Sequence, residues 1–305
     1  MNKITCPLCN SINISLVEKI NTKDIEKAYL YLLNVVTKFS FKEIKYMTCS
    51  NCNIGFFDPM ATGGEELYEQ LQKFEWYYMT NKPEYILAKK YVPCNGKILE
   101  VGSGKAAFSE IVGKDRYVGL EFNNEAIKSA KSIGINLIKE SIEQFAIENT
   151  NKYDAVVSFQ VLEHVSNPSS FIQGCIDSLK KGGRLILAVP NHNGICGLAQ
   201  NSILDIPPHH VTHWTEKTMK YIAIQFNLDL VAVDCEAVSN NHLLWAAHSI
   251  YSENIRNIFG IDKKLFDTRL SAKIIKKCSS ILTKLIPCNI NLVKGHTVLA
   301  CYSKK

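Results

Sequence analysis

The chain has 305 residues, of which 46% are hydrophobic and 21% are charged. This length suffices for one large domain or two ordinary ones with a substantial core, which excludes a short binding peptide. The composition argues against general disorder and against fibrous repeats. The net charge of +6, from 35 basic and 29 acidic residues, is spread along the chain, so we expect no nucleic-acid partner.

The start of the chain lacks the apolar run of a secretory signal, because residues 1–9 lead directly into a cysteine pair. The longest apolar stretches are interrupted before they reach the roughly 18 residues that a membrane-spanning helix needs. We therefore expect no membrane span and a cytoplasmic protein. In that compartment the eleven cysteines are expected to be reduced thiols or metal ligands rather than disulfides.

Two Cys-x-x-Cys pairs stand near the start of the chain, Cys6 with Cys9 and Cys49 with Cys52. Each pair can present two thiolates from one tight turn, and four sulfurs complete a tetrahedral zinc site with no open position, which indicates a structural metal. The pairs are separated by 39 residues, so an inserted element must bring them together, and residues 23–37 are the expected insertion. An iron–sulfur or redox role and unligated thiols are the alternatives.

From residue 97 onward, short apolar strands alternate with amphipathic helices, which is typical of a parallel sheet covered on both faces. Strands are predicted at residues 97–101, 116–120, 136–139, 155–159, 184–189, 228–234 and 296–302. The helix after Pro168 is predicted to end at Lys180–Gly183, and Thr215 is a predicted N-cap of a later helix. Residues 65–91, which are rich in aromatic side chains, and residues 238–287 are also predicted to be helical.

A glycine turn, Gly102-Ser-Gly104, follows the first of these strands and precedes a predicted helix. Glycines let the backbone turn tightly and approach a ligand at the carboxyl edge of a sheet. The turn also satisfies the dinucleotide fingerprint, which keeps a nicotinamide cofactor open. Glu100 argues against that cofactor, because its carboxylate would repel phosphates but would stabilise the ammonium and sulfonium of S-adenosylmethionine. Glu121 stands 19 residues after Gly102, at the distance from which a carboxylate accepts hydrogen bonds from ribose.

Four sequence blocks carry a family resemblance: Leu99-Glu-Val-Gly-Ser-Gly104, Val118-Gly-Leu-Glu121, Tyr153-Asp-Ala-Val-Val-Ser-Phe-Gln-Val-Leu-Glu-His-Val165 and Leu179-Lys-Lys-Gly-Gly-Arg-Leu-Ile-Leu-Ala-Val-Pro-Asn191. With the cysteine pairs, they resemble class I S-adenosylmethionine-dependent methyltransferases that carry an N-terminal zinc-ribbon-like module and often modify sugars or other small molecules. The resemblance covers residues 6 to about 234 and the last strand. One departure is Ala106 at the usual third glycine, where we expect a small effect because Ala adds only a methyl group.

The resemblance implies an α/β fold with a doubly wound, mostly parallel, Rossmann-like sheet that binds S-adenosylmethionine. The residues implied or considered at the cofactor are Glu100, Gly102, Ser103, Gly104, Glu121, Phe122, Ser141, Ile142 and Gln160. Glu100 and the glycine turn would contact the methionine part, which Gln160 would face, and Glu121 would contact the ribose. Residues around Ser141 and Ile142 would contact the adenine. Phe122 has two interpretations, packing on the adenosine or simple core.

Histidines are concentrated in Asp205-Ile-Pro-Pro-His-His-Val-Thr-His-Trp214, after the strand predicted at 184–189. Methyl transfer to a hydroxyl requires an aligned acceptor and loss of a proton, and histidine suits that proton step at neutral pH. His209, His210 and His164 are the candidate catalytic residues. His213 is a weaker candidate that could instead start the next helix, and Trp214 could face the acceptor. The alternative is that these histidines only bond backbone carbonyls. The remaining ones, His192, His242, His248 and His296, are expected to be structural or solvent-facing.

The sequence therefore predicts a zinc-ribbon-like module at residues 1–60 and a helical bridge at 61–92. A Rossmann-like methyltransferase core at 93–236 follows, with a helical insertion at 237–293 and a final core strand at 294–305. The expected activity is methyl transfer from S-adenosylmethionine to a small, sugar-like or hydroxylated metabolite. An NAD-dependent oxidoreductase and a non-catalytic, zinc-anchored RNA- or protein-binding module are the alternatives. The acceptor, the methylated atom and the oligomeric state stay open.

Overall fold

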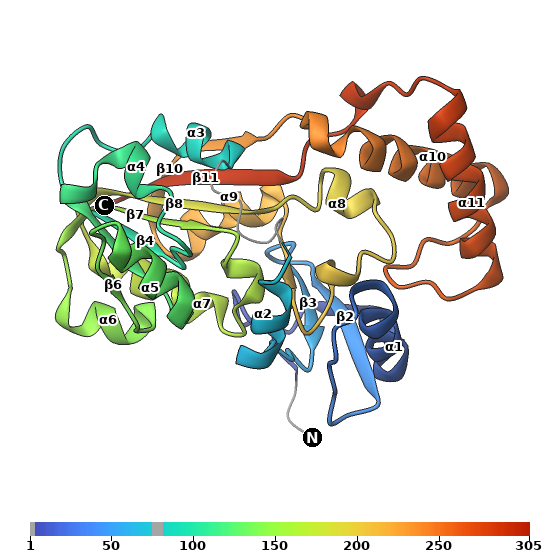
Figure 1. The fold of residues 1–305 in the computed structure, drawn as a ribbon, viewed down its shortest axis with the longest axis horizontal. Helices are drawn as coiled ribbons and strands as arrows, with labels where there is room; N and C mark the ends of the chain where they lie inside the picture. The colour runs from blue at the N-terminus through green and yellow to red at the C-terminus, as the bar shows by residue number, and fades with distance from the viewer. Residues whose placement is uncertain (1–3, 75–81) are drawn as a thin grey trace.

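The structure is a computed structural model that describes residues 4–74 and 82–305, arranged around two β-sheets (Figure 1). The aromatic residues Trp76, Tyr77 and Tyr78 of the predicted helical bridge lie outside the described residues. Two short helices of that bridge are described, α2 (Glu65–Leu71) and α3 (Pro83–Lys89).

The smaller sheet is antiparallel and contains β1 (Ile14–Asn21), β2 (Glu43–Cys49), β3 (Gly55–Asp58) and β9 (Thr212–His213), in that order. The insertion predicted between the cysteine pairs is helix α1 (Thr22–Leu33). Its N-terminus is capped by Asn21, whose side chain accepts a hydrogen bond from the backbone N–H of Lys23. Strand β9 comes from a distant part of the chain, so the histidine-rich segment forms one edge of the N-terminal sheet.

The larger sheet has the order β10-β11-β8-β7-β4-β5-β6. Its strands are β4 (Ile98–Val101), β5 (Tyr117–Leu120), β6 (Leu137–Ile138), β7 (Tyr153–Phe159), β8 (Leu179–Pro190), β10 (Leu228–Cys235) and β11 (Thr297–Lys304). Strands β4 to β8 pair in parallel, whereas β11 runs antiparallel to both β8 and β10. The predicted doubly wound, mostly parallel α/β fold is therefore confirmed.

Helices cover both faces of the larger sheet, because alternate residues of its buried strands point to opposite sides. For example, Val156 packs in the core on one face and Val157 in the core on the other. The helices in this part are α4 (Ser109–Val112), α5 (Asn124–Ser132), α6 (Ile142–Glu148), α7 (Pro168–Ser178) and α9 (Glu216–Gln225). Residues of α3 and α4 pack with the core that contains Val157, and residues of α6, α7 and α9 pack with the core that contains Val156.

Helix α7 ends earlier than predicted. Its last residue is Ser178, and Leu179 already pairs with Tyr153 as the first residue of β8, so residues 180–183 belong to the strand instead of the helix end. The predicted N-cap at Thr215 is confirmed, because its side chain accepts a hydrogen bond from the backbone N–H of Thr218.

The stretch predicted to be helical before the last strand contains α10 (Leu243–Phe259) and α11 (Leu270–Leu285), and the short helix α8 (Ile195–Leu198) lies between them and the sheet. Figure 1 shows α10 and α11 side by side at the end of the molecule away from β6. Among the helices of the described residues, none combines the length and the apolar character needed to cross a bilayer.

Candidate active site

The glycine turn after β4 requires glycine at Gly102 for two reasons. Its φ of +75° lies in the left-handed region, and a Cβ there would come within 2.3 Å of Cγ2 of Val161. The turn is tied to β5, because the backbone N–H groups of Gly102 and Ser103 both donate to the carbonyl of Leu120, at 2.9 and 3.0 Å. The turn therefore touches both β5 and the segment that leaves β7.

Ala106 constrains the backbone more than the sequence indicated. It adopts a φ of +58°, the left-handed region that a residue with a Cβ rarely occupies. The prediction of a small effect considered only the space taken by a methyl group. The backbone conformation is what makes glycine usual at this position, and Ala106 adopts it inside a fully buried cluster with Ala130 and Leu137.

Glu121 follows β5 directly and is hydrogen-bonded to the glycine turn. One carboxylate oxygen accepts the N–H of Gly104 at 2.7 Å, and the other accepts the N–H groups of Phe122 and Asn123, each at 2.8 Å. An anionic oxygen pair is thus fixed at the end of β5, where the sequence predicted contacts to a ribose. Phe122 is 60% exposed, which excludes the simple-core interpretation of this residue.

Glu100 differs from the charged group that the sequence argument assumed. It is 1% exposed and accepts a 2.5 Å hydrogen bond from the hydroxyl of Tyr117. Burial raises the pKa of Glu100 to about 8, against the lowering effect of the Tyr117 hydrogen bond. The side chain is therefore mostly protonated at neutral pH, which corrects the expectation of a permanent carboxylate.

The remaining residues predicted at the cofactor differ in their surroundings. Ser141 caps α6 by accepting the N–H of Gln144 at 3.3 Å, and Ile142 is 2% exposed. Gln160 follows β7 directly, and its amide lies 3.3 Å from both Oε1 of Glu84 and Oγ1 of Thr297. Gln160 thus occupies the carboxyl end of the central strands, whereas Ser141 and Ile142 begin the helix after β6.

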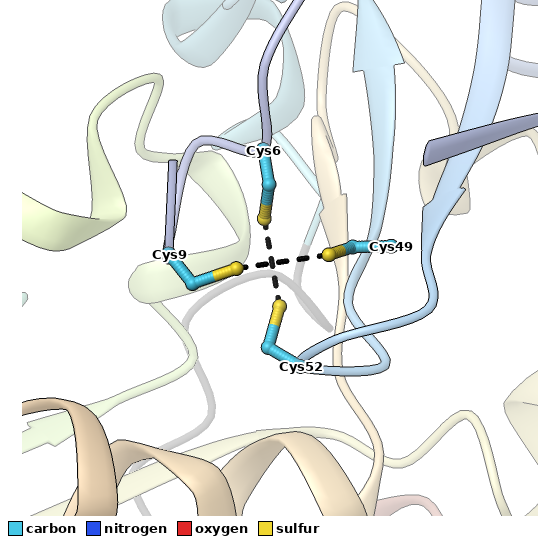
Figure 2. A group of neighbouring side chains, drawn as sticks. All are labelled: Cys6, Cys9, Cys49 and Cys52. Carbon is cyan, nitrogen blue, oxygen red and sulfur yellow. Dashed lines mark hydrogen bonds between the residues drawn. The ribbon is translucent and has the colours of Figure 1, made fainter. Parts of the chain in front are cut away.

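The two cysteine pairs come together as predicted (Figure 2). The Sγ atoms of Cys6 and Cys52 are 3.5 Å apart, those of Cys9 and Cys49 are 3.7 Å apart, and all four lie within 4.8 Å of one another. A regular tetrahedron with zinc–sulfur bonds of ~2.3 Å has edges of about 3.8 Å. The four thiols therefore fit a zinc ion.

The histidine-rich segment lies against the segment that leaves β7. The N–H of Val211 donates to the carbonyl of Glu163 at 2.8 Å, and the hydroxyl of Thr212 donates to the carbonyl of Leu162 at 3.3 Å. Because β7 and β8 are parallel, the segments that follow them emerge at the same edge of the sheet as the glycine turn. Three of the predicted catalytic residues are brought together there.

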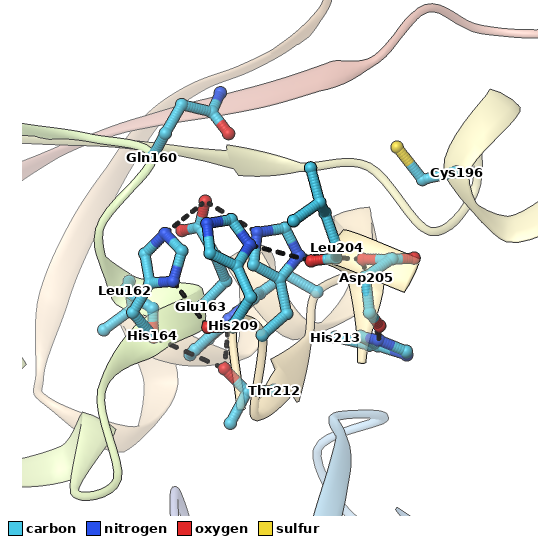
Figure 3. Close-up of polar contacts among 12 residues, drawn as sticks. Gln160, Leu162, Glu163, His164, Cys196, Leu204, Asp205, His209, Thr212 and His213 are labelled. Carbon is cyan, nitrogen blue, oxygen red and sulfur yellow. Dashed lines mark hydrogen bonds and ion pairs between the residues drawn. The ribbon is translucent and has the colours of Figure 1, made fainter. Parts of the chain in front are cut away.

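We call His164, His209 and His210 the histidine cluster. A ring nitrogen of each lies within 4.8 Å of those of the other two, and the ring centroids are 4.5 to 4.8 Å apart. Figure 3 shows the side chain of Glu163 directed toward this group. Its Oε1 lies 3.9 Å from Nε2 of both His164 and His210.

Burial sets the charges in this region. It lowers the pKa of His164 to about 3 and holds the pKa of His209 well below its ordinary value. It raises the pKa of Glu163 to about 7, against the lowering effect of His210. His164 and His209 are therefore neutral imidazoles at neutral pH, each with one nitrogen that can accept a hydrogen bond.

Asp205 is a central residue that the sequence interpretation did not select. Its Oδ1 lies 2.9 Å from Nδ1 of His210, and its Oδ2 lies 3.0 Å from Nε2 of His192. Burial alone would raise the pKa of Asp205, but the neighbouring His192, His213 and His210 hold it well below the ordinary value. Glu163 was missed in the same way. Both acids stand next to or within the histidine motifs, and that proximity was the available signal.

His213 and Trp214 do not face an acceptor. Nδ1 of His213 lies 3.0 Å from the hydroxyl of Tyr46, and its Nε2 lies 2.7 Å from the carbonyl of Asp205. Trp214 is fully buried and donates its indole N–H to Thr212 at 2.9 Å. His213 belongs to β9 rather than to the start of the next helix. Both side chains hold the segment in place.

The chain is similar to curated ubiquinone biosynthesis O-methyltransferases. It is 30% identical to that of Escherichia fergusonii over 106 residues, which are 32% of this chain and 44% of the relative. It is 34% identical to that of Shewanella pealeana over 105 residues, again 32% and 44%. This chain thus spans less than half the length of these relatives.

Two solved structures are similar at lower identity. A SAM-dependent methyltransferase from Archaeoglobus fulgidus is 16% identical, with a TM-score of 0.49 over 78% of this chain and 100% of that chain. A putative sarcosine dimethylglycine methyltransferase from Galdieria sulphuraria is 14% identical, with a TM-score of 0.46 over 79% of this chain and 88% of that chain.

A family model described as a methyltransferase domain matches residues 70–233, which is more than half of the chain. The matched residues include the glycine turn, Glu121, the segment after β7 and the histidine-rich segment. The chain therefore belongs to the methyltransferase domain family, within the class I S-adenosylmethionine-dependent methyltransferases.

Proposed function

We propose that this protein transfers a methyl group from S-adenosylmethionine to a hydroxyl oxygen of a small, sugar-like or otherwise hydroxylated metabolite in the cytoplasm. This proposal is carried by one observation: the three rings of the histidine cluster and the carboxylate of Glu163 meet just after the carboxyl end of β7. The names of the curated O-methyltransferase relatives support oxygen as the methylated atom and a small molecule as the acceptor.

The residues around the glycine turn fit the cofactor. Glu121 offers two fixed carboxylate oxygens to the ribose hydroxyls, and the exposed ring of Phe122 beside it offers an apolar surface to the adenosine. Gly102 and Gly104 would let the methionine part approach the backbone closely, because neither residue has a Cβ. When bound, S-adenosylmethionine supplies a methyl carbon made electrophilic by its sulfonium.

The histidine cluster would receive the acceptor hydroxyl and promote loss of its proton. When no metal ion occupies the histidine cluster, Nε2 of His210 is the best-placed atom for that proton. Asp205 accepts the Nδ1–H of His210 and so fixes the tautomer. Asp205 is in turn held by His192, 3.0 Å away. His209 and His164 would orient the acceptor beside it.

Zinc in the four-cysteine site is a structural part of this proposal, since four thiolates leave no open position for a substrate. Residues 1–60 would form the zinc-binding module and 61–92 the bridge. Residues 93–236 with 294–305 would form the catalytic core, and 237–293 a helical insertion.

Mass spectrometry of the purified protein for bound cofactor, followed by labelled-methyl transfer to a metabolite extract, tests the function. We expect carried-over S-adenosylmethionine or its demethylated product, and label in hydroxylated metabolites that depends on His210. Thermal-shift measurements with S-adenosylmethionine and with NAD are the control for cofactor class. Stabilisation by NAD alone, or no label transfer by a protein that binds the cofactor, would contradict the proposal.

A further inference from the structure

Each imidazole of the histidine cluster is anchored through Nδ1. Nδ1 of His164 lies 2.6 Å from the carbonyl of His209, and Nδ1 of His209 lies 2.8 Å from the carbonyl of Leu204. Nδ1 of His210 lies 2.9 Å from Oδ1 of Asp205. Carbonyl and carboxylate oxygens only accept hydrogen bonds, so Nδ1 carries the proton in all three rings and Nε2 carries the lone pair. Histidines that bind metal ions are held in this way.

The lone pairs converge beside a buried acid. The ligand nitrogens of the three histidines lie within 4.8 Å of one another, and ligands around one first-row metal ion with bonds of ~2.1 Å are about 3 to 3.5 Å apart. Small rotations of the rings would close that difference. Glu163 adds an oxygen 3.9 Å from Nε2 of both His164 and His210.

Glu163 also has an unsatisfied atom. The residue is 1% exposed, and its Oε2 has no hydrogen-bond partner among the described residues. Burying a carboxylate oxygen without a partner is costly, and a bound cation would compensate for it. No lysine or arginine is ion-paired with Glu163 in the part of the chain that the structure describes, and the ring nitrogens near its Oε1 belong to His164 and His210, each 3.9 Å away.

We propose that His164, His209, His210 and Glu163 bind one divalent first-row transition-metal ion. Three imidazoles with one carboxylate are a ligand set suited to zinc, iron or manganese, and they differ in chemistry from the four thiols near the N-terminus. Asp205 would be a positioning residue that orients His210 toward the ion, and His192 would hold Asp205.

The role of this ion rests on the proposed function. Coordination of the acceptor oxygen by the ion would lower the pKa of the hydroxyl. The O–H bond would break with the proton passing to water, and the oxygen would form a bond to the methyl carbon. The carbon–sulfur bond of S-adenosylmethionine would break with its electron pair going to sulfur.

Cobalt titration of the full chain tests the site directly. The protein is stripped with a chelator, given one equivalent of zinc to fill the four-cysteine site, and titrated with Co²⁺ in the absence of cofactor and acceptor. We expect one Co²⁺ per chain, with visible d–d absorption and without a sulfur-to-cobalt charge-transfer band. Asp205→Asn should lower the affinity ~10- to 100-fold. Glu163→Gln should also weaken binding, and His248→Ala, on α10, should not change it.

Two results would overturn the metal site: no cobalt binding by the folded wild-type protein at millimolar Co²⁺, or unchanged binding in a His164→Ala, His210→Ala double variant. If that double variant does not fold, Glu163→Gln and Asp205→Asn give the same decision, because both keep the size of the side chain. Cobalt binding with normal stoichiometry but no methyl transfer would contradict the proposed function and leave the metal site standing.

Discussion

The hydroxyl of Tyr46 lies 3.0 Å from Nδ1 of His213, although the two residues are 167 positions apart in the sequence. Tyr46 belongs to β2 and His213 to β9, and β3 lies between these strands. Because Nε2 of His213 donates to the carbonyl of Asp205 at 2.7 Å, Nδ1 accepts from Tyr46. The N-terminal sheet therefore fixes the segment that carries His210.

Tyr46→Phe should destabilise the protein by about 1 to 3 kcal/mol, because Nδ1 of His213 would be left buried without a donor. Turnover should fall more than the affinity for S-adenosylmethionine, since the change reaches the histidine cluster and not the glycine turn. Denaturant unfolding and calorimetry measure the two effects. Tyr31→Phe, at a side chain that is 88% exposed on α1, is the matched control. Equal stability of both variants would show that the hydrogen bond contributes nothing.

Elemental analysis should find one zinc ion per chain in the four-cysteine site, when metal in the histidine cluster is first removed by a mild chelator. Cys6→Ser combined with Cys49→Ser should lose this zinc and lower the unfolding temperature, because the turn at residues 6–9 and the turn between β2 and β3 lose the metal that joins them. Cys94→Ser, at an exposed thiol, should retain it. Zinc retained by the double variant would reject the assignment.

Glu121→Ala should weaken binding of S-adenosylmethionine by about 1.5 to 3 kcal/mol, the range for hydrogen bonds to a charged group. The substitution also removes the acceptor of the Gly104 N–H, so the turn itself would lose order. Glu125→Gln, at an exposed carboxylate on α5, is the control. Calorimetry that gives the same affinity for Glu121→Ala and wild type would remove Glu121 from the cofactor site.

His210→Ala should lower turnover by roughly 10² to 10⁴ while the affinity for the cofactor hardly changes, because no predicted cofactor contact is lost. His209→Ala should act mainly on the KM for the acceptor if this residue orients rather than activates it. Steady-state kinetics with a labelled methyl group separate kcat from KM. If both variants kept full activity, the segment would be structural and His164 would become the leading candidate.

Stability should fall as the pH rises from 4.5 toward about 8, in part because of Glu100. Its pKa is raised from 4.5 to about 8 in the folded chain, so in this window the folded state keeps a proton that the unfolded state has lost. The stabilisation is complete below pH 4.5 and disappears as the pH passes through about 8. Glu100→Gln should reduce this slope in denaturant unfolding across the window. An unchanged slope would show that Glu100 does not hold the proton.

Local sequence patterns were enough to predict most helices and strands of the fold. The alternation of strands and helices predicted every strand of the larger sheet, with boundaries that differ from the structure by up to five residues, as at the start of β8. Thr215 was recognisable because an N-cap depends on side chains within one turn. The predicted end of α7 was wrong because Lys180–Gly183 has the residues of a helix C-terminus, whereas the pairing of Leu179 with Tyr153 already begins β8.

The sequence by itself determined the cysteine pairs, the glycine turn and the histidine motif, since each is a short spacing whose chemistry is local. Only the tertiary structure decided that β9 joins the N-terminal sheet, that Trp214 is buried, and that Asp205 connects His192 with His210. It also decided the protonation of Glu100, because a pKa depends on burial by distant residues. The pairing of β9 with β3 joins segments far apart in the chain, and no spacing within a short segment encodes which distant segment will lie against it.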